Sequence, residues 1–390
     1  MQIGLLGKAN VGKSTFFSAA TNTSVQIGNF PFTTIKPNVG VTHVTTKCVC
    51  KEMNLSHDIP ACKNGTRYIP VKIIDIAGLV PGAHEGKGLG NQFLDDARQA
   101  DILIHVIDGS GSTDIQGQPT TLGSHDPKED ITFVEQEFDK WFLNILDREW
   151  SRLIKEVGQK KISLIEGITK RFSGLGAQDF DVQSTLQDTN LAGRKPAEWS
   201  EDERESFVTA LRKRIKPIIN AANKADLYAD TIPKKLDANP CSAETELLLS
   251  KATSAKLINY TLGGLSFVIT SEISDAQKNA LNMAKEVLNK FNGTGIQNIL
   301  NIAVFKKLKR ITVYPVEDEK KLSNKDGVIL PDARLLTTGS TAKDLAFTIH
   351  QDIGSGFLHG INIKTGQRVG ADYTLQDLDI IKIVSTKSRG

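Results

Sequence analysis

Residues 7–15 read Gly7-Lys8-Ala9-Asn10-Val11-Gly12-Lys13-Ser14-Thr15, and this stretch decides the fold. It matches the pattern G-x-x-x-x-G-K-[ST], a glycine-rich loop whose backbone N–H groups surround phosphates. An apolar run from Met1 to Leu6 precedes the loop, and a helix-like pattern begins at Phe16. This order of strand, loop and helix directs the positive end of a helix at the phosphates. We therefore expect a P-loop nucleotide-binding domain.

The loop supplies most of the expected contacts to the phosphates. Lys13 is expected to reach the β and γ phosphates, which makes it a candidate catalytic residue, and Ser14 to hold Mg²⁺. The expected nucleotide-binding residues of the loop are Asn10, Val11, Gly12, Lys13, Ser14 and Thr15.

The buried-strand run from Val71 to Ile76 ends in a second motif, Asp75-Ile76-Ala77-Gly78. A carboxylate at the end of a strand can anchor Mg²⁺, and a glycine N–H can meet the γ phosphate, so Asp75 is a candidate metal ligand and Gly78 a candidate catalytic residue. A loop threonine is expected to complete the Mg²⁺ ligands. We favour Thr34 as this ligand, and Thr33 is its rival.

The base is expected to be guanine, because Asn223-Lys224-Ala225-Asp226 has the spacing of a guanine-reading motif. The Asp226 carboxylate can accept from N1–H and the 2-amino group, while the stem of Lys224 lies against the ring. Asn223 belongs to the same motif, and Ser242-Ala243-Glu244 follows the next weak strand pattern and is expected to contact the base as well. Adenine lacks these donors, so GTP and GDP should bind better than ATP.

Each motif follows the carboxyl end of a near-continuous apolar strand, which indicates an α/β fold with a mostly parallel sheet flanked by helices. Residues 127–216 exceed what such a sheet needs, and their apolar residues recur at helical spacing, so we expect a helical, coiled-coil-like insertion with one long amphipathic helix from Val134 to Val157. The predicted segments are residues 1–126 and 217–308 for the nucleotide-binding domain, 127–216 for the insertion, and 309–390 for a small domain of strands around a helix from Thr341 to Ile353.

Composition narrows the class of protein. The 390 residues carry a net charge of +3, and no apolar run is long enough to span a bilayer, so we expect no membrane partner. The first residues lack a signal-peptide pattern, and four cysteines are too few for a disulfide framework in a chain of this length. We therefore expect a cytoplasmic protein. Its mildly basic charge permits an RNA or ribosome partner without requiring one.

With these motifs, the chain resembles the Obg-related GTPases, specifically a GTP-specific, archaeal-type relative of the YchF branch. The C-terminal residues Gly339 to Ala346, Ile349-His350 and Leu375 to Ile383 look like a TGS domain, a small ubiquitin-like fold. The resemblance implies a ribosome or RNA partner, bound through the TGS and helical domains, and no DNA partner. It rests on these further stretches: Asn29-Phe30-Pro31-Phe32-Thr33-Thr34, Lys36-Pro37-Asn38-Val39-Gly40, Asp75-Ile76-Ala77-Gly78-Leu79-Val80, and Gly86-Lys87-Gly88-Leu89-Gly90-Asn91-Gln92-Phe93-Leu94.

Three positions refine this resemblance. The YchF branch usually degrades the guanine motif and accepts ATP, whereas Asn223, Lys224 and Asp226 are intact here. Leu79 stands where many GTPases have a water-orienting glutamine, which predicts slow intrinsic hydrolysis. Asn10 resembles an asparagine that holds K⁺ near the phosphates in K⁺-activated relatives, and an ordinary loop-stabilising amide is the alternative.

Cys48, Cys50, His57 and Cys62 form a compact cluster in the sequence. A zinc site is one interpretation, but the spacing is not that of a standard zinc finger, and free thiols on a hairpin are the favoured one. For the whole chain the leading hypothesis is a slow, Mg²⁺-dependent GTPase switch. The alternatives are a broad-specificity ATP and GTP hydrolase in a stress response, and an RNA- or protein-binding scaffold with a structural nucleotide.

Overall fold

The computed structural model describes residues 1–21, 39–57, 59–76, 96–228 and 236–386. These residues form two compact units. Within the described ranges, the first unit takes in residues 1–21, 39–42 and 71–299, and the second takes in residues 43–70 and 300–386. Residues 43–70, which the sequence-based division assigned to the nucleotide-binding domain, are thus grouped with the C-terminal part of the chain.

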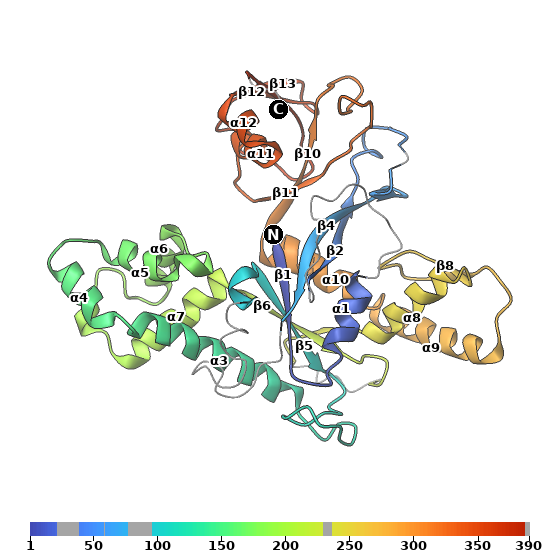
Figure 1. The fold of residues 1–390 in the computed structure, drawn as a ribbon, viewed down its shortest axis with the longest axis horizontal. Helices are drawn as coiled ribbons and strands as arrows, with labels where there is room; N and C mark the ends of the chain where they lie inside the picture. Colours follow the sequence, from blue (N-terminus) through green and yellow to red (C-terminus); the bar gives the residue numbers. More distant parts are fainter. Residues whose placement is uncertain (22–38, 58, 77–95, 229–235, 387–390) are drawn as a thin grey trace. The chain divides into compact units, whose positions relative to one another are not determined.

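The main sheet has the strand order β2-β4-β1-β5-β6-β7, and β3 pairs with β4 (Figure 1). Strand β1 runs parallel to both β4 and β5, and β6 runs parallel to β5 and β7, which confirms the predicted mostly parallel sheet. The bounds are β1 Gln2–Leu6, β2 Val39–Lys47, β3 Cys62–Lys63, β4 Thr66–Asp75, β5 Ile102–Asp108, β6 Ile218–Asn223 and β7 Asn239–Pro240.

The order of the strands places a ligand site at the end of β1. All seven residues of β5 are buried, as expected for a strand covered on both faces. Strands β2 and β4, which follow β1 in the sequence, lie on one side of it, and the later strands β5, β6 and β7 lie on the other side. The strand order therefore reverses at β1. Open α/β sheets bind ligands at the carboxyl ends of the strands at such a point. The P-loop leaves β1 there.

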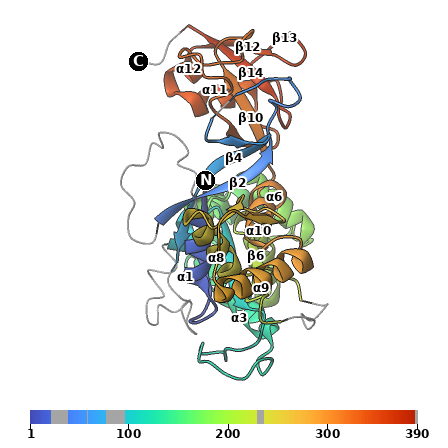
Figure 2. The ribbon, with the colours of Figure 1, turned by 90° about the vertical axis from the view of Figure 1, so that its right-hand side faces the viewer.

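Helix α1 (Lys13–Thr21) and the helices after β7 pack in the first unit. In Figures 1 and 2, α8 (Ala243–Ser254) lies beside α9 (Asp275–Phe291), and α8 also contacts α1. Ser242 caps α8 and Ser274 caps α9, each through a side-chain oxygen that accepts a backbone N–H bond. The remaining elements are β8 Ile258–Tyr260, β9 Phe267–Ile269 and α10 Ile296–Asn301.

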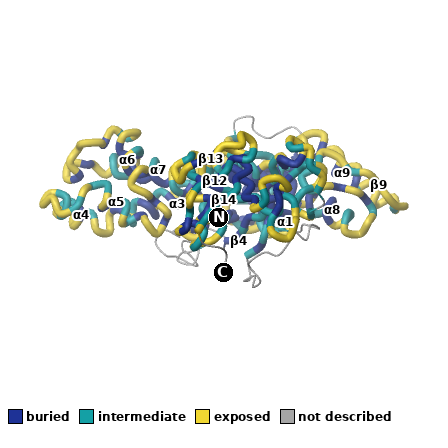
Figure 3. The backbone as a smooth tube through the Cα atoms, turned by 90° about the horizontal axis from the view of Figure 1, so that it is seen from above, coloured by how far each residue is buried: buried dark blue, intermediate teal, exposed yellow. Residues whose placement is uncertain are grey.

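Residues 127–215 form the expected group of helices. Asp126 caps the first of them and Pro127 opens it, while Ser200 and Glu203 form a capping box at the start of the last. In Figure 3, buried segments run along α3 and α7, and exposed segments mark the outer turns. The bounds are α3 Pro127–Asp147, α4 Trp150–Gly158, α5 Leu164–Phe172, η2 Ser173–Leu175, α6 Asp179–Asp188, η3 Pro196–Glu198 and α7 Glu201–Ile215.

The predicted single helix from Val134 to Val157 is wrong, because α3 ends at Asp147 and α4 begins at Trp150. Arg204 of α7 holds both sides of the break. Its Nε donates to Asp147 at 2.9 Å, and its guanidinium lies 5.8 Å from the centre of the Trp150 ring. The Trp150 ring in turn packs 5.4 Å from that of Trp199. These tertiary contacts turn the chain at a place where the helical pattern continues.

Aromatic side chains of the insertion lie in the seam between its helices. Phe138, Trp141 and Phe142 are all buried, and Phe142 stacks on Phe172 of α5 at 5.4 Å. Arg212 of α7 adds an ion pair with Asp139 of α3 at 2.8 Å. The core of the insertion continues into the main sheet, because its buried residues form one cluster with Leu6, Ile74 and Leu103.

The second unit contains a five-stranded sheet in the order β11-β10-β14-β12-β13. The predicted helix from Thr341 to Ile353 is interrupted at His350, whose extended backbone ends α11 and caps α12. Among the described residues, no helix has the length and apolarity to cross a membrane. The bounds are η4 Ile302–Lys307, β10 Arg310–Val316, β11 Arg334–Thr337, α11 Ala342–Ile349, α12 Gln351–Ser355, β12 Phe357–Asn362, β13 Gln367–Val369 and β14 Ile380–Ser385.

Candidate functional site

The P-loop joins β1 to α1 and is shaped by Gly12. Gly12 has a φ of +86°, and a Cβ atom there would come within 2.4 Å of the Asn223 side-chain nitrogen. A larger residue is therefore excluded by both backbone conformation and space. The first helical hydrogen bond follows at once, from Phe16 N–H to the Gly12 carbonyl at 2.8 Å.

Lys13, the first residue of α1, and Asp75, the last residue of β4, form an ion pair. Their side chains are only 14% and 16% exposed. Ser14, the next residue of α1, is exposed. A serine hydroxyl and a strand-end carboxylate are oxygen ligands of the kind that Mg²⁺ prefers, so these two residues fit that ion. Val11 is buried beneath the loop, and Thr15 is half-buried.

Asn223 connects the phosphate loop to the segments that were expected to read the base. Its side chain is buried, and its Nδ2 donates to the Val11 carbonyl at 2.9 Å. Its Oδ1 accepts from the Ala243 N–H at 3.0 Å. One amide thus joins three segments that lie far apart in the sequence, which fixes the distance between the phosphate and base ends of the site.

Lys224 is held by Asp108, a residue at the end of β5 to which the sequence assigned no role. Lys224 has a φ of +65°, and its Nζ lies 2.8 Å from Asp108 Oδ2. Burial alone would raise the pKa of Asp108. Hydrogen bonds from Lys224, Ser110 and Ser112 outweigh this effect and hold the pKa below its usual value. Asp108 is therefore a charged anchor that restrains the lysine stem.

Asp226 is oriented by Ser242, whose Oγ donates to Asp226 Oδ1 at 2.6 Å. Ser242 is fully buried and also accepts from the Thr245 N–H at 3.1 Å as the cap of α8. Glu244 is exposed on the first turn of that helix. The half-buried Asp226 carboxylate is thus aimed by a rigid helix start, which suits the recognition of two adjacent N–H donors of a planar base.

Further polar residues brace the site, and of these Asp130 and Glu246 were missed by the sequence reasoning, whereas Asn10 was an expected nucleotide contact. Lys8 Nζ pairs with the buried Asp130 of α3 at 2.8 Å, and Asn10 Nδ2 donates to the Gly117 carbonyl at 2.9 Å. Glu246 is buried in α8, accepts from the Tyr260 hydroxyl at 3.1 Å, and has a pKa raised by burial. Asp108 was also assigned no role, but the sequence carried a signal for it, because Asp108 ends a buried strand as Asp75 does. The roles of Asp130 and Glu246 depend on long-range contacts, which the sequence does not show.

Several expected site residues lie outside the described residues. They are Gly78, Thr34 and its rival Thr33, together with Leu79. The structure brings together Lys13 with Asp75, and Val11 with Asn223 and Ala243.

Three family models match the chain. Residues 2–144 match a 50S ribosome-binding GTPase model, and residues 221–318 match the G4 motif-containing domain of the YGR210-like Obg-like GTPases. Residues 327–385 match the TGS domain, as the sequence predicted.

Whole-chain relatives agree with these matches. A GTP-binding protein of Methanocaldococcus jannaschii is 43% identical over 98% of both chains. The ribosome-binding ATPase YchF of Bacillus subtilis is 26% identical over 97% of both chains. The solved structure of a GTP-binding protein from Pyrococcus horikoshii OT3 covers 99% of this chain and 100% of its own, with 39% identity and a TM-score of 0.78.

Proposed function

Because the chain belongs to the Obg-like family of P-loop GTPases that includes YchF, we propose that it binds GTP with Mg²⁺ and hydrolyses it to GDP and phosphate. Hydrolysis is slow in this proposal, and it switches the affinity for a ribosomal or RNA partner. The observation that carries the proposal is the position of Asn223, whose side chain joins the P-loop to the guanine motif.

Guanine selection rests on Asp226 and Lys224. The Asp226 carboxylate accepts the N1–H and 2-amino protons of guanine, and Ser242 holds it in place for that purpose. The ion pair with Asp108 restrains Lys224, so that its aliphatic stem lies along the ring. An adenine base would leave the Asp226 carboxylate without donors, which costs about 1–3 kcal/mol and disfavours ATP by tens of times.

The phosphates and Mg²⁺ are assigned to the opposite end of the site. Ser14 and Asp75 hold Mg²⁺, which neutralises phosphate charge when it is bound, and Thr34 is the proposed third ligand. Lys13 exchanges its partner Asp75 for the β and γ phosphates, and the remaining loop contacts come from Asn10 to Thr15. Gly78 offers its N–H to the γ phosphate.

Slow turnover follows from the residue beside Gly78. Leu79 stands in the place of a glutamine and cannot orient water by hydrogen bonding. Asn10 is the residue that would respond to K⁺. Its Nδ2 is used by the Gly117 carbonyl, which leaves its Oδ1 as the oxygen for a monovalent cation. Higher hydrolysis rates in KCl than in NaCl would support this role, and equal rates would remove it.

A ribosomal or RNA partner is proposed from the relatives and the TGS domain. YchF of Bacillus subtilis is named a ribosome-binding ATPase, and the first family model is that of a ribosome-binding GTPase. The partner is expected to contact the TGS and helical domains, with the nucleotide state setting the affinity. Co-sedimentation with ribosomes in a GTP analogue, in GDP and without nucleotide tests this. Equal binding in all three states would contradict the switch.

The base assignment is tested with Asp226→Asn. Asparagine keeps an acceptor for N1–H but places a donor opposite the 2-amino group, so GTP affinity should fall about 10-fold or more. Xanthosine triphosphate carries a carbonyl at that position, and its affinity should rise. The measurement is fluorescence titration of GTP, ATP and xanthosine triphosphate.

Asp237→Asn is the matched control, because Asp237 is exposed and, among the described residues, the hydrogen bond that it receives goes to its backbone carbonyl. It should leave all three affinities unchanged. Equal affinity of the unmodified protein for ATP and GTP would favour the second candidate, a broad-specificity hydrolase. The ATPase names of relatives such as YchF give that candidate its support.

A further inference from the structure

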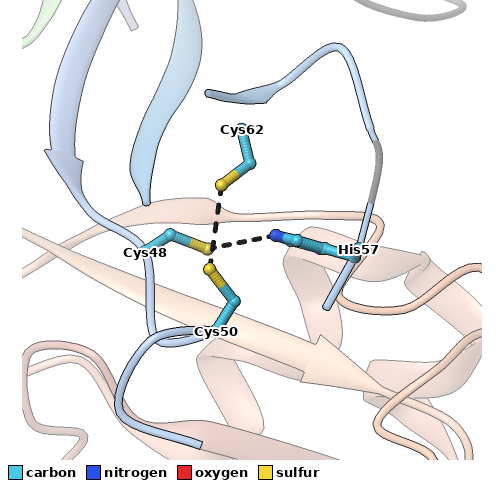
Figure 4. A group of neighbouring side chains, drawn as sticks. All are labelled: Cys48, Cys50, His57 and Cys62. Atoms are coloured by element: carbon cyan, nitrogen blue, oxygen red, sulfur yellow. Dashed lines mark hydrogen bonds between the residues drawn. The ribbon is translucent and has the colours of Figure 1, made fainter. Parts of the chain in front are cut away.

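Four side chains of the second unit meet around one point outside the nucleotide site. Cys48 and Cys50 follow β2, His57 lies in the next loop, and Cys62 begins β3. Figure 4 shows the four side chains pointing toward one another. Their sulfur and nitrogen atoms all lie within 4.8 Å of each other. The spacing in the sequence favoured free thiols here, but four side chains that converge in this way have the arrangement of ligands around a metal ion.

The distances between these atoms are those of a tetrahedral zinc site. With Zn–S of about 2.3 Å and Zn–N of about 2.0 Å, ligand sulfurs lie about 3.8 Å apart, and sulfur and nitrogen lie about 3.5 Å apart. Cys50 Sγ and Cys62 Sγ are 3.8 Å apart. Cys48 Sγ and His57 Nε2 are 3.7 Å apart. A disulfide would need about 2.05 Å between sulfurs, and all four cysteines of the chain are free.

The ring nitrogen of His57 that does not face the cluster, Nδ1, contacts a backbone carbonyl, as it does in many metal-binding histidines. Its Nδ1 lies 3.1 Å from the Ile329 carbonyl. A carbonyl can only accept, so Nδ1 carries the proton and the bare Nε2 faces Cys48. A backbone carbonyl that fixes the tautomer in this way is typical of the partners that surround zinc ligands.

The charge next to the cluster is complementary to a zinc site. Three thiolates, one neutral imidazole and Zn²⁺ sum to one negative charge. Arg67 pairs with Cys62 across the β3–β4 hairpin, and it is only 2% exposed. Its guanidinium donates to the carbonyls of Leu330 and Pro331, and in the described part of the chain no carboxylate pairs with it. A buried cation of this kind needs a counter-charge, which an anionic zinc site would supply.

The surroundings indicate a structural role. Cys48 and Cys50 are buried among apolar residues of β10, β14 and the loop between β10 and β11, which include Tyr314, Leu330 and Ile380. Among the described residues between β2 and β4, the one strand is the two-residue β3, and the rest of this segment consists of turns and loops. A metal bound there would fasten this segment.

We propose that Cys48, Cys50, His57 and Cys62 bind one Zn²⁺ in a closed tetrahedral site that stabilises the second unit. All four positions around the ion are occupied by protein atoms, so the site has no open position for water or substrate and is not catalytic. The proposal does not depend on the nucleotide site, because the two share no residue.

The test begins with the full-length protein, purified under reducing conditions from zinc-containing medium. Metal analysis should find about one zinc per chain. After removal of the zinc with a chelator, Co²⁺ should bind stoichiometrically and give the sulfur-to-cobalt charge-transfer band of thiolate ligands. Absence of stoichiometric binding, or a cobalt spectrum without that band, would overturn the proposal. Iron or copper in place of zinc would overturn the choice of metal.

Variants then identify the ligands. Cys50→Ser combined with Cys62→Ser should reduce zinc affinity about 100-fold or more, beyond the 10–100-fold effect of losing a residue that only supports a ligand. His57→Ala should also weaken binding, whereas His57→Cys should retain zinc, because a fourth thiolate replaces the imidazole. If His57→Cys binds zinc no better than His57→Ala, His57 is not a ligand.

Cys241→Ser is the matched control. Cys241 is a buried, free cysteine of the first unit, so its loss should leave one zinc per chain. Should the cluster variants fail to fold, the cobalt titration of the unmodified protein still decides the proposal. A chelator should also lower the melting temperature of the unmodified protein, and added Zn²⁺ should restore it.

Discussion

The base end and the phosphate end of the nucleotide site are built in different ways. At the base end, Asn223, Lys224 and Asp226 each have a partner elsewhere in the protein that holds the side chain in place. At the phosphate end, Lys13 and Asp75 are each other's partner. Under the proposed function, this difference teaches that the residues that select the base are held in place before it binds, whereas Lys13 and Asp75 exchange partners when the phosphates and Mg²⁺ bind.

The largest expected effect is that of Lys13→Ala, which breaks the phosphate end. The variant leaves Asp75 without its cation and removes the positive charge proposed for the β and γ phosphates. Single-turnover GTP hydrolysis should fall about 100-fold or more.

Lys63→Ala, at an exposed lysine of β3, serves as the control and should hydrolyse GTP at the unmodified rate. Hydrolysis by Lys13→Ala within a few-fold of the unmodified protein would show that the nucleotide does not bind at this loop in the proposed way.

Asn223→Ala should have the next largest effect, because it disconnects the two ends. It leaves the Val11 carbonyl and the Ala243 N–H without their buried partner. We expect a loss of about 2–3 kcal/mol in the free energy of unfolding and a GTP affinity lower by about 10-fold or more. Urea denaturation and nucleotide titration measure the two quantities.

Asn239→Ala is a suitable comparison, since Asn239 is half-buried and makes one long hydrogen bond of 3.3 Å to the Asn220 carbonyl. It should cost less than about 1 kcal/mol and leave GTP affinity unchanged. Equal effects of the two variants would mean that Asn223 contributes no more than an ordinary asparagine.

The smallest expected effect on GTP affinity is that of Ser242→Ala, which tests the support of Asp226 at the base end. Ser242→Ala removes both the hydrogen bond to Asp226 and the cap of α8. GTP affinity should fall about 5-fold, equivalent to about 1 kcal/mol, while ATP affinity should stay as it is. Ser242→Thr, which keeps the hydroxyl, should restore GTP affinity.

Ser274→Ala separates the two roles of Ser242, because Ser274 caps α9 in the same way but orients no site residue. Both alanine variants should lose about 0.5–2 kcal/mol of stability, and only Ser242→Ala should bind GTP less tightly. A matching loss of affinity in Ser274→Ala would assign the effect to helix stability alone.

Where local sequence determines geometry, the sequence-based predictions hold. The mostly parallel sheet and the TGS domain are confirmed. The long helix through Val157 is wrong because Arg204, distant in sequence, turns the chain after Asp147. Asp130 and Glu246 were missed because the role of a buried carboxylate on a helix shows only through the partners that other segments bring to it.

The sequence alone determined that a phosphate-binding loop starts this chain and that a guanine motif follows a later strand. Both are short runs of consecutive residues whose backbone conformation depends on near neighbours. Only the tertiary structure decided how the ends are joined, through Asn223 and Val11, which lie 212 positions apart. It also brought Cys48, Cys50, His57 and Cys62 together, which their spacing could not show, and the zinc site is proposed from that convergence.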